Sequence, residues 1–227
     1  MCLDEYFGDW LKVIDTQELY KVVKEINNLY KTQQCEPAYE DIFKAFHITP
    51  YKDLMLVSLS QDPYFQHNVS TGVCFANKKD VVKLSPSLEI LKEALINFEV
   101  PHNLINFDPT LEEVSKQGVL FLNSALTVRT NQPNSHTYLW RPFISSLLRN
   151  LSTYNLGLVY ILWGSVAKSF STFIDSRNVV FRMPHPAYYA RTNTKIPSSF
   201  FVEVNKVIYD KFGTKIEWFK EENFNYE

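Results

Sequence analysis

The sequence of 227 residues contains little cysteine and little glycine, and these shortages exclude several classes of protein. Its cysteines are Cys2, Cys35 and Cys74, an odd number of widely separated residues without a CxxC pair, which excludes a disulfide framework, a zinc site and an iron–sulfur cluster. The six glycines form neither GxGxxG nor GxxxxGK[ST], the loops whose amides bind phosphates in many nucleotide enzymes. We therefore expect a reducing compartment and no nucleotide cofactor of those types.

Long apolar runs and an excess of charge of one sign are also missing. No stretch approaches 18 apolar residues and the N-terminus is acidic, so we expect neither a membrane-spanning helix nor a secretory signal. The formal net charge is -2, with 21% charged residues and 45% hydrophobic residues, which is typical of a folded globular chain. Any binding to nucleic acid would have to come from a local surface rather than from net charge.

The apolar pattern predicts a protein in which strands and helices alternate. Four short apolar runs read as buried strands, at residues 54–59, 119–122, 158–162 and 179–183. Amphipathic helices are predicted from Asp15 or Thr16 onward and in the segments 88–95, 143–151, 166–173 and 200–208. We expect one α/β domain over residues 1–227, with a central, mostly parallel four-stranded sheet flanked by helices.

Polar residues follow each predicted strand, and in a parallel sheet the carboxyl ends of the strands share one edge. Asp62, Asn123, Ser165 and His185 are therefore expected to lie close together. Taken singly, Asp62 and Asn123 are equally well explained as turn or cap residues, and a histidine between prolines is more often structural. Together they suit hydrolysis by a bound water, because a carboxylate stabilises positive charge and an imidazole stabilises negative charge. Glycosidic cleavage has that charge pattern, whereas a serine hydrolase would need the GxSxG turn that is missing.

A series of motifs, in order along nearly the whole chain, resembles the family 1 uracil-DNA glycosylases. The motifs are Gln61-Asp62-Pro63-Tyr64, Gly72-Val73-Cys74-Phe75, Ser85-Pro86-Ser87-Leu88, Gln117-Gly118-Val119-Leu120-Phe121-Leu122-Asn123, Leu126-Thr127-Val128-Arg129, Asn134-Ser135-His136, Leu162-Trp163-Gly164-Ser165 and His185-Pro186. The resemblance implies an enzyme that flips deoxyuridine out of DNA and hydrolyses the bond between uracil and the sugar without metal or cofactor.

The resemblance also implies a role for each matched residue. Asp62 would position the attacking water, and His185 would donate a hydrogen bond to uracil O2 as a neutral imidazole. Asn123 would read the Watson–Crick edge of uracil. Four residues in all are implied in base binding: Gln61, Tyr64, Phe75 and Asn123.

Phe75 would stack on the flipped base and Tyr64 would fill the space of a thymine methyl, although both could instead be core aromatics. Ser87 and Ser165 would bind the DNA backbone, with a plain N-cap role as the alternative. We consider His136 structural.

The chain departs from the family pattern at two motifs. Ser60 and Phe65 stand where the family has glycine and histidine, which affects water positioning and a phosphate contact. The last motif has lost two serines and a leucine, so that Tyr189 stands at the position of the residue that fills the gap left by the flipped base. Because Ala187 cannot donate to a phosphate, binding to DNA would then depend on Arg191, Lys195 and Lys168.

The partner expected from the resemblance is uracil-containing DNA, bound by a monomer away from any membrane. We expect a cytoplasmic location, or a host nucleus for a viral protein, and the sequence identifies no protein inhibitor or replication partner. The alternative function is a glycosylase-like DNA-binding or adaptor protein with little catalysis, which the changes at Phe65, Ala187 and Tyr189 would favour. Retention of the base-reading and charge-stabilising residues argues against it.

Overall fold

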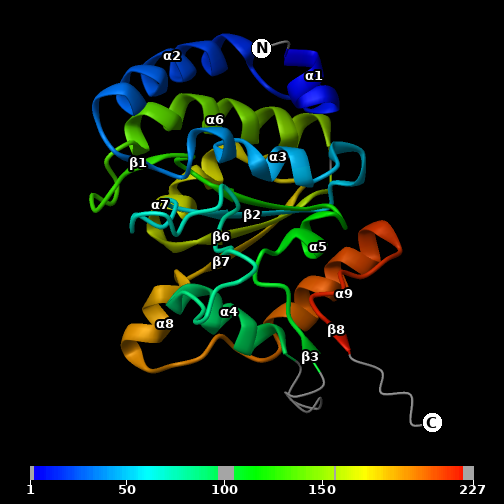
Figure 1. The fold of residues 1–227 in the computed structure, drawn as a ribbon. Coiled ribbons are helices and arrows are strands. Elements are labelled where there is room, and N and C mark those ends of the chain that lie inside the picture. Colours follow the sequence, from blue (N-terminus) through cyan, green and yellow to red (C-terminus); the bar gives the residue numbers. More distant parts are fainter. Residues whose placement is uncertain (1–2, 97–104, 156, 222–227) are drawn as a thin grey trace, which may run out of the picture.

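The computed structural model describes residues 3–96, 105–155 and 157–221 (Figure 1). Its α-helices are α1 Leu3–Phe7, α2 Thr16–Thr32, α3 Lys44–Ile48, α4 Pro86–Leu95, α5 Glu112–Ser115, α6 Thr137–Tyr154, α7 Gly164–Lys168, α8 Pro186–Thr192 and α9 Phe200–Phe212. Short 3-10 helices are η1 Gly8–Lys12, η2 Tyr39–Asp41, η3 Tyr51–Asp53 and η5 Ser169–Phe173. Its strands are β1 Cys35–Glu36, β2 Leu56–Ser60, β3 Ile105–Asn106, β4 Val119–Asn123, β5 Val128–Arg129, β6 Val159–Trp163, β7 Val179–Met183 and β8 Lys220–Glu221.

The four apolar runs form one sheet in the order β4-β2-β6-β7, and every pair is parallel. The predicted α/β fold with a four-stranded sheet is therefore confirmed, with each strand within two residues of its expected bounds. In this order β2 lies between β4 and β6, so the chain leaves β2 toward one side of the sheet and later returns to its other side. This arrangement opens a crevice at the carboxyl ends of the strands in an α/β sheet. The helices α7 and α8, which follow β6 and β7, both lie at that edge, on the left in Figure 1.

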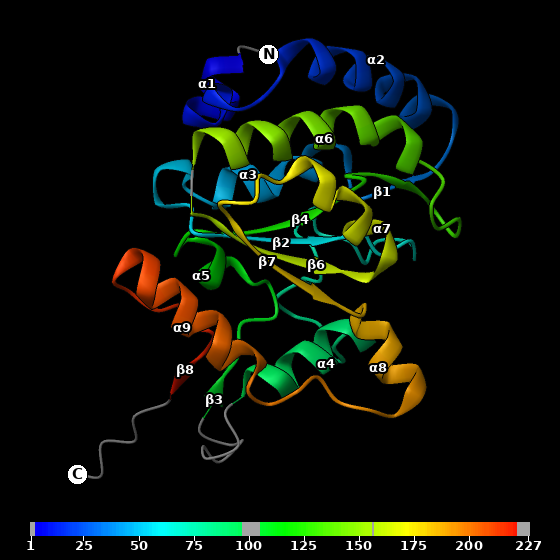
Figure 2. The same ribbon diagram turned by 180° about the vertical axis from the view of Figure 1, so that it is seen from behind.

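Alternate side chains of the central strands enter two separate cores, as the twofold period of a strand requires. Val57 and Leu59 belong to the core under α2, α3 and α6, whereas Leu56 belongs to the core under α4 and α9. Figures 1 and 2 show these two groups of helices on opposite faces of the sheet. Because both faces are covered, the strands consist mainly of apolar residues, and the polar residues of interest lie at or after their carboxyl ends.

The predicted helices are present, with one correction. Asp15 caps α2, because its side chain accepts from the backbone amides of Gln17 and Glu18. The segment expected to form one helix over 166–173 is instead α7, which ends at Lys168, followed by the 3-10 helix η5. Among the described residues, no helix has the length and apolar character needed to cross a membrane.

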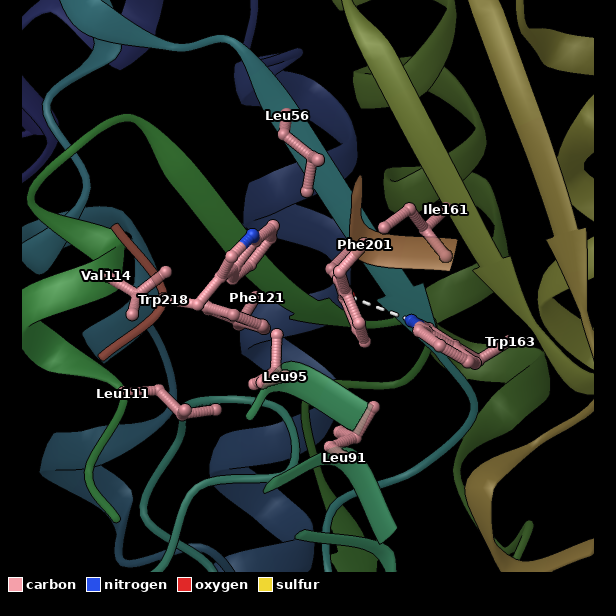
Figure 3. Close-up of a pocket in the computed structure, with 11 residues that line it drawn as sticks. Leu56, Leu91, Leu95, Leu111, Val114, Phe121, Ile161, Trp163, Phe201 and Trp218 are labelled. Carbon is pink, nitrogen blue, oxygen red and sulfur yellow. Dashed lines mark hydrogen bonds between the residues drawn. The ribbon is translucent and has the colours of Figure 1, made fainter. Parts of the chain in front are cut away.

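The core beneath β2 and β6 is closed around a small apolar cavity of about 10 Å³, lined by residues that include Leu91, Leu111 and Phe201 (Figure 3). That volume is about the space of one water molecule, so the cavity is a packing defect rather than a ligand site. The Trp163 side chain borders it and donates its indole N–H to Ser58 Oγ at 3.0 Å. This bond fixes Trp163, the last residue of β6, at the point where the sheet meets the crevice.

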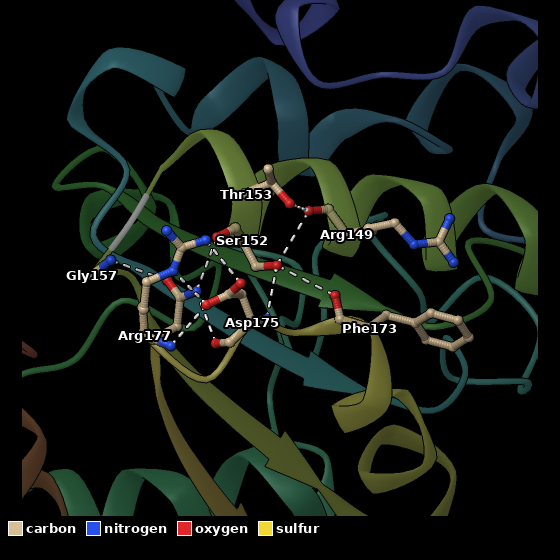
Figure 4. A network of polar contacts seen from close by, with 8 residues as sticks. Arg149, Ser152, Thr153, Gly157, Phe173, Asp175 and Arg177 are labelled. Atoms are coloured by element: carbon tan, nitrogen blue, oxygen red, sulfur yellow. Dashed lines mark hydrogen bonds and ion pairs between the residues drawn. The ribbon is translucent and has the colours of Figure 1, made fainter.

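A polar network holds the opposite end of the sheet, where β6 and β7 begin (Figure 4). The hydroxyl of Ser152, near the end of α6, donates to the carbonyl of Phe173 at 3.3 Å and accepts from the Asp175 amide at 3.0 Å. The Arg177 side chain donates to both carboxylate oxygens of Asp175, at 2.8 and 2.9 Å. The loop before β7 is thereby tied to α6, which fixes the position from which β7 runs toward the crevice.

Candidate active site

A cavity of about 790 Å³ opens at the carboxyl ends of the central strands. Its volume is in the range of ligand sites. Of the predicted site residues, eight line it: Gln61, Asp62, Tyr64, Phe75, Ser87, Asn123, Ser165 and His185. The ninth, Tyr189, does not. The structure thus brings together side chains from the loops after β2, β4, β6 and β7, which lie up to 124 residues apart in sequence.

Asp62 is the only acidic side chain among the described residues that line this cavity. Its Oδ2 accepts from the backbone amide of Asn134 at 2.6 Å and from Gln61 Nε2 at 3.3 Å, and its Oδ1 accepts from Thr137 Oγ1 at 3.4 Å. Burial raises the pKa of the carboxyl above its ordinary value, while these hydrogen bonds act in the opposite direction. The bonds therefore stabilise the charged form that burial disfavours.

His185 is uncharged. Its Nδ1 accepts from the backbone amide of Ala187 at 3.1 Å, which leaves Nε2 to carry the ring proton. Burial, with a smaller contribution from the positive charge of Arg191, lowers the pKa of His185 to about 4. At neutral pH the ring is an uncharged donor, held at the start of α8 between two prolines that stiffen its backbone.

Phe75 lines the cavity and packs against two other rings at steep angles. Phe75 lies 5.7 Å from the His185 ring and 6.1 Å from Trp163, centroid to centroid. Its φ of +67° is in the left-handed region, which a bulky residue rarely occupies and which marks a position under functional constraint. The Tyr64 hydroxyl donates to the carbonyl of Phe75 at 3.0 Å, so the two aromatic residues hold each other in place.

Asn123 is the last residue of β4 and is 6% exposed. Its side-chain oxygen Oδ1 is buried and has no hydrogen-bond partner among the described residues. A buried polar atom without a partner costs about 1–3 kcal/mol. This oxygen is therefore available to accept a hydrogen bond from a ligand in the cavity.

The rim of the cavity carries positive charge and hydroxyls. Lys168 and Arg191 line it, while Lys195 instead lies 3.8 Å from Glu93, outside the cavity. Ser87 and Ser165 are each the second residue of a helix, and neither α4 nor α7 has a side-chain cap bond. The N-cap alternative for these two serines is therefore wrong, and their hydroxyls face a cavity whose other charges are cationic apart from Asp62.

The structure does not place Tyr189 at the cavity. Its side chain is only 7% exposed and packs in the core with α4 and α9, whereas Tyr188 is 45% exposed and lines the cavity. The reason is that α8 begins at Pro186, so successive side chains point about 100° apart around the helix. The expected placement of Tyr189 at the cavity is therefore wrong, and Tyr188 is the tyrosine of α8 that lines it.

Sequence reasoning also missed the contribution of the segment after β5. Asn134 and Thr137 bind the Asp62 carboxylate, although the Asn134-Ser135-His136 motif was expected to be structural. Asn134 has a φ of +67°, a conformation that asparagine tolerates well, but the sequence alone does not show what its amide contacts. Across the described ranges, no three His, Cys, Asp or Glu side chains gather as metal ligands.

The carboxyl ends of a parallel sheet thus bring together a carboxylate, an uncharged imidazole, an amide oxygen without a protein partner and the Phe75 ring. A family model described as the uracil DNA glycosylase superfamily matches residues 46–208. The chain belongs to this superfamily.

Curated relatives cover nearly the whole chain. A uracil-DNA glycosylase of Fusobacterium nucleatum is 31% identical over 93% of this chain and 95% of the relative, and one of Francisella tularensis is 34% identical over 80% and 83%. Among solved structures, the mimivirus uracil-DNA glycosylase matches with a TM-score of 0.73 and 20% identity, over 96% of this chain and 91% of that one. The structural match independently supports the fold.

The depressed pKa of His185 predicts that its ring stays neutral between about pH 5 and 8. The pKa of His185 in the folded protein lies below the ordinary value of 6.5. Folding stability is therefore not reduced by His185 above pH 6.5, and it falls as the pH is lowered from 6.5 toward 4, because the unfolded chain binds the proton more readily. Nitrogen-15 chemical shifts of the ring across a pH titration, compared with those of exposed His67, measure this directly. A His185 titration midpoint near 6.5 would contradict the buried, neutral state. His185→Gln should remove the loss of folding stability between pH 6.5 and 4 that the histidine causes.

Proposed function

We propose that this protein hydrolyses the N-glycosidic bond of deoxyuridine in DNA, releasing free uracil and leaving an abasic site for base excision repair. The observation that carries the proposal is the unpaired, buried Asn123 Oδ1 in a cavity that also holds Asp62 and His185. Curated relatives that bear the name uracil-DNA glycosylase, at 31–34% identity over most of the chain, support it.

Recognition of uracil would depend on its edge and its face. The Oδ1 of Asn123 would accept from N3–H and the amide would donate to O4, an order of donor and acceptor that cytosine reverses. Phe75 would stack on the flipped base, which is worth about 1–3 kcal/mol and helps to offset unstacking from DNA. Tyr64 would exclude the methyl of thymine. The Gln61 carbonyl already accepts from Ser124 Oγ at 2.9 Å, so its backbone is held firmly beside the base.

Hydrolysis would use the different charges of the two catalytic residues, an anionic Asp62 and an uncharged His185. As the bond between N1 and C1′ breaks, the electron pair passes to uracil and the sugar becomes an oxocarbenium-like cation. Asp62 would stabilise that cation and orient the water whose oxygen bonds to C1′, and the proton that this water releases would neutralise the uracil anion. The Nε2–H of His185 would donate to uracil O2, where negative charge develops. A neutral imidazole suits this role because its Nε2–H can donate a hydrogen bond to the developing anion while the ring itself stays uncharged.

The DNA backbone would be held by hydroxyls and cations on the rim. Ser87 and Ser165 would donate hydrogen bonds to phosphates. Lys168 and Arg191 would supply local positive charge, which the chain as a whole lacks because its net charge is slightly negative. Ala187 offers no hydroxyl, and its backbone amide is already bound to His185. Tyr188, exposed at the same rim, would fill the gap that the flipped nucleotide leaves in the duplex.

The proposed partner is uracil-containing DNA, and we propose that the protein acts on it as a monomer. A location with the DNA, in the cytoplasm or in a host nucleus, follows from the substrate and agrees with the free thiols of Cys35 and Cys74. Structures of mimivirus UNG variants in complex with UGI are among the structural matches.

Replacement of Asp62 by asparagine tests the chemistry. We predict that Asp62→Asn lowers the rate of uracil release from a single-uracil oligonucleotide at least ~10²–10³-fold, because a preorganised charge is lost. Asp80→Asn, which changes an exposed acid away from the cavity, is the matched control and should keep the wild-type rate. Chromatography of the released base provides the measurement. A folded wild-type protein that binds DNA but releases no uracil would overturn the proposed function, and a fully active Asp62→Asn would remove Asp62 from the mechanism.

Replacement of Tyr188 tests the gap-filling role. We predict that Tyr188→Ala slows excision from duplex DNA by about tenfold through the loss of stacking, and changes excision from single-stranded DNA much less. Only a duplex leaves a gap to fill. Tyr138→Ala is the control, because Tyr138 is 73% exposed but does not line the cavity. Equal losses on single-stranded and duplex substrates would contradict the assignment.

A further inference from the structure

The polar contacts that orient the catalytic carboxylate come mainly from a segment more than seventy residues away. The segment 130–137, between β5 and the first turn of α6, supplies two of the three donors to Asp62: the Asn134 amide and the Thr137 hydroxyl. The third donor is Gln61, its neighbour in the chain. Phe65, on the same loop as Asp62, has no polar side-chain atom to contribute.

Asn134 contacts both of the functional residues that follow β2. Its backbone amide donates to Asp62 Oδ2 at 2.6 Å, and its side-chain Oδ1 accepts from Gln61 Nε2 at 2.6 Å. The left-handed conformation of Asn134 lets its amide and its side chain bind these two adjacent residues. One residue therefore fixes the carboxylate and the neighbouring amide relative to each other.

The segment that carries Asn134 is itself fastened to the loop it serves. The Asn131 amide donates to the Phe65 carbonyl at 2.8 Å, and the Arg129 amide donates to Ser135 Oγ at 2.8 Å. Thr130 is bound through its hydroxyl to the buried carboxylate of Glu36 at 3.3 Å. Glu36 also accepts from the Asn68 amide, at 3.1 Å, so the same carboxylate joins the two loops.

From this geometry we infer that Asn134 is a positioning residue for uracil excision, acting through Asp62 and Gln61 without contact with the reacting atoms. The inference rests on the proposed function. A purely structural role would use only the left-handed turn, which glycine provides equally well. A positioning role also needs the Oδ1 acceptor, which glycine lacks.

The chain contains a matched control in the same segment. Asn131 is also left-handed, with a φ of +62°, and also donates its amide to the loop, but no hydrogen bond of its side chain is seen in the described part of the structure. We predict that Asn134→Gly lowers single-turnover uracil release about tenfold, the cost of one strong hydrogen bond, whereas Asn131→Gly stays within about twofold of wild type. Both residues are exposed, so both variants should fold, which circular dichroism verifies. Affinity for a uracil-free duplex should not change.

The pH profile provides a readout that a structural role would not affect. Asn134→Asp keeps an acceptor for Gln61 but adds a negative charge beside Asp62, which should raise the pKa of that carboxyl and move the acidic limb of the rate profile to higher pH. Wild-type activity in Asn134→Gly, an equal loss in Asn131→Gly, or an unmoved acidic limb would each overturn the inference. If the wild-type protein itself released no uracil, the proposed function would fail instead, so the two failures are distinguishable.

Discussion

The register of the parallel sheet is the constraint on which the site depends. Ser60 at the end of β2 pairs with Asn123 at the end of β4, and Trp163 at the end of β6 pairs with Met183 at the end of β7. Because all four strands run the same way and end level, the residues that follow them enter one cavity. A shift of one residue in β4 would turn Asn123 toward the opposite face of the sheet and remove its amide from the cavity.

Burial disfavours charge on both residues proposed for catalysis, but their surroundings differ. Burial and the charge of Arg191 lower the pKa of His185 to about 4, and burial raises the pKa of Asp62. His185 therefore stays uncharged at neutral pH, and its Nδ1 accepts from the Ala187 amide. At Asp62, three hydrogen-bond donors act against burial and favour the anion. An uncharged hydrogen-bond donor and a hydrogen-bonded carboxyl thus lie in one cavity.

The sequence predicted the sheet and the cavity well, because buried parallel strands are short apolar runs and the residues after them must meet. It failed where side-chain direction depends on helix phase: α8 begins at Pro186, and this turns Tyr189 into the core and Tyr188 to the rim. It also failed for Asn134, whose contact with Asp62 joins residues 72 positions apart. No local pattern specifies such a bond, because it depends on how β1, β5 and the loop after β2 pack together.

In the proposed function, the Asn123 amide would select uracil by the order of its donor and acceptor. The most direct test compares the bases released by the wild-type protein and Asn123→Asp from otherwise identical oligonucleotides that contain one uracil or one cytosine. The account predicts uracil alone from the wild type, and a preference for uracil over cytosine that falls at least about tenfold in the variant, since a carboxylate can accept from the amino group of cytosine. An unchanged preference for uracil in a folded, active Asn123→Asp would contradict it.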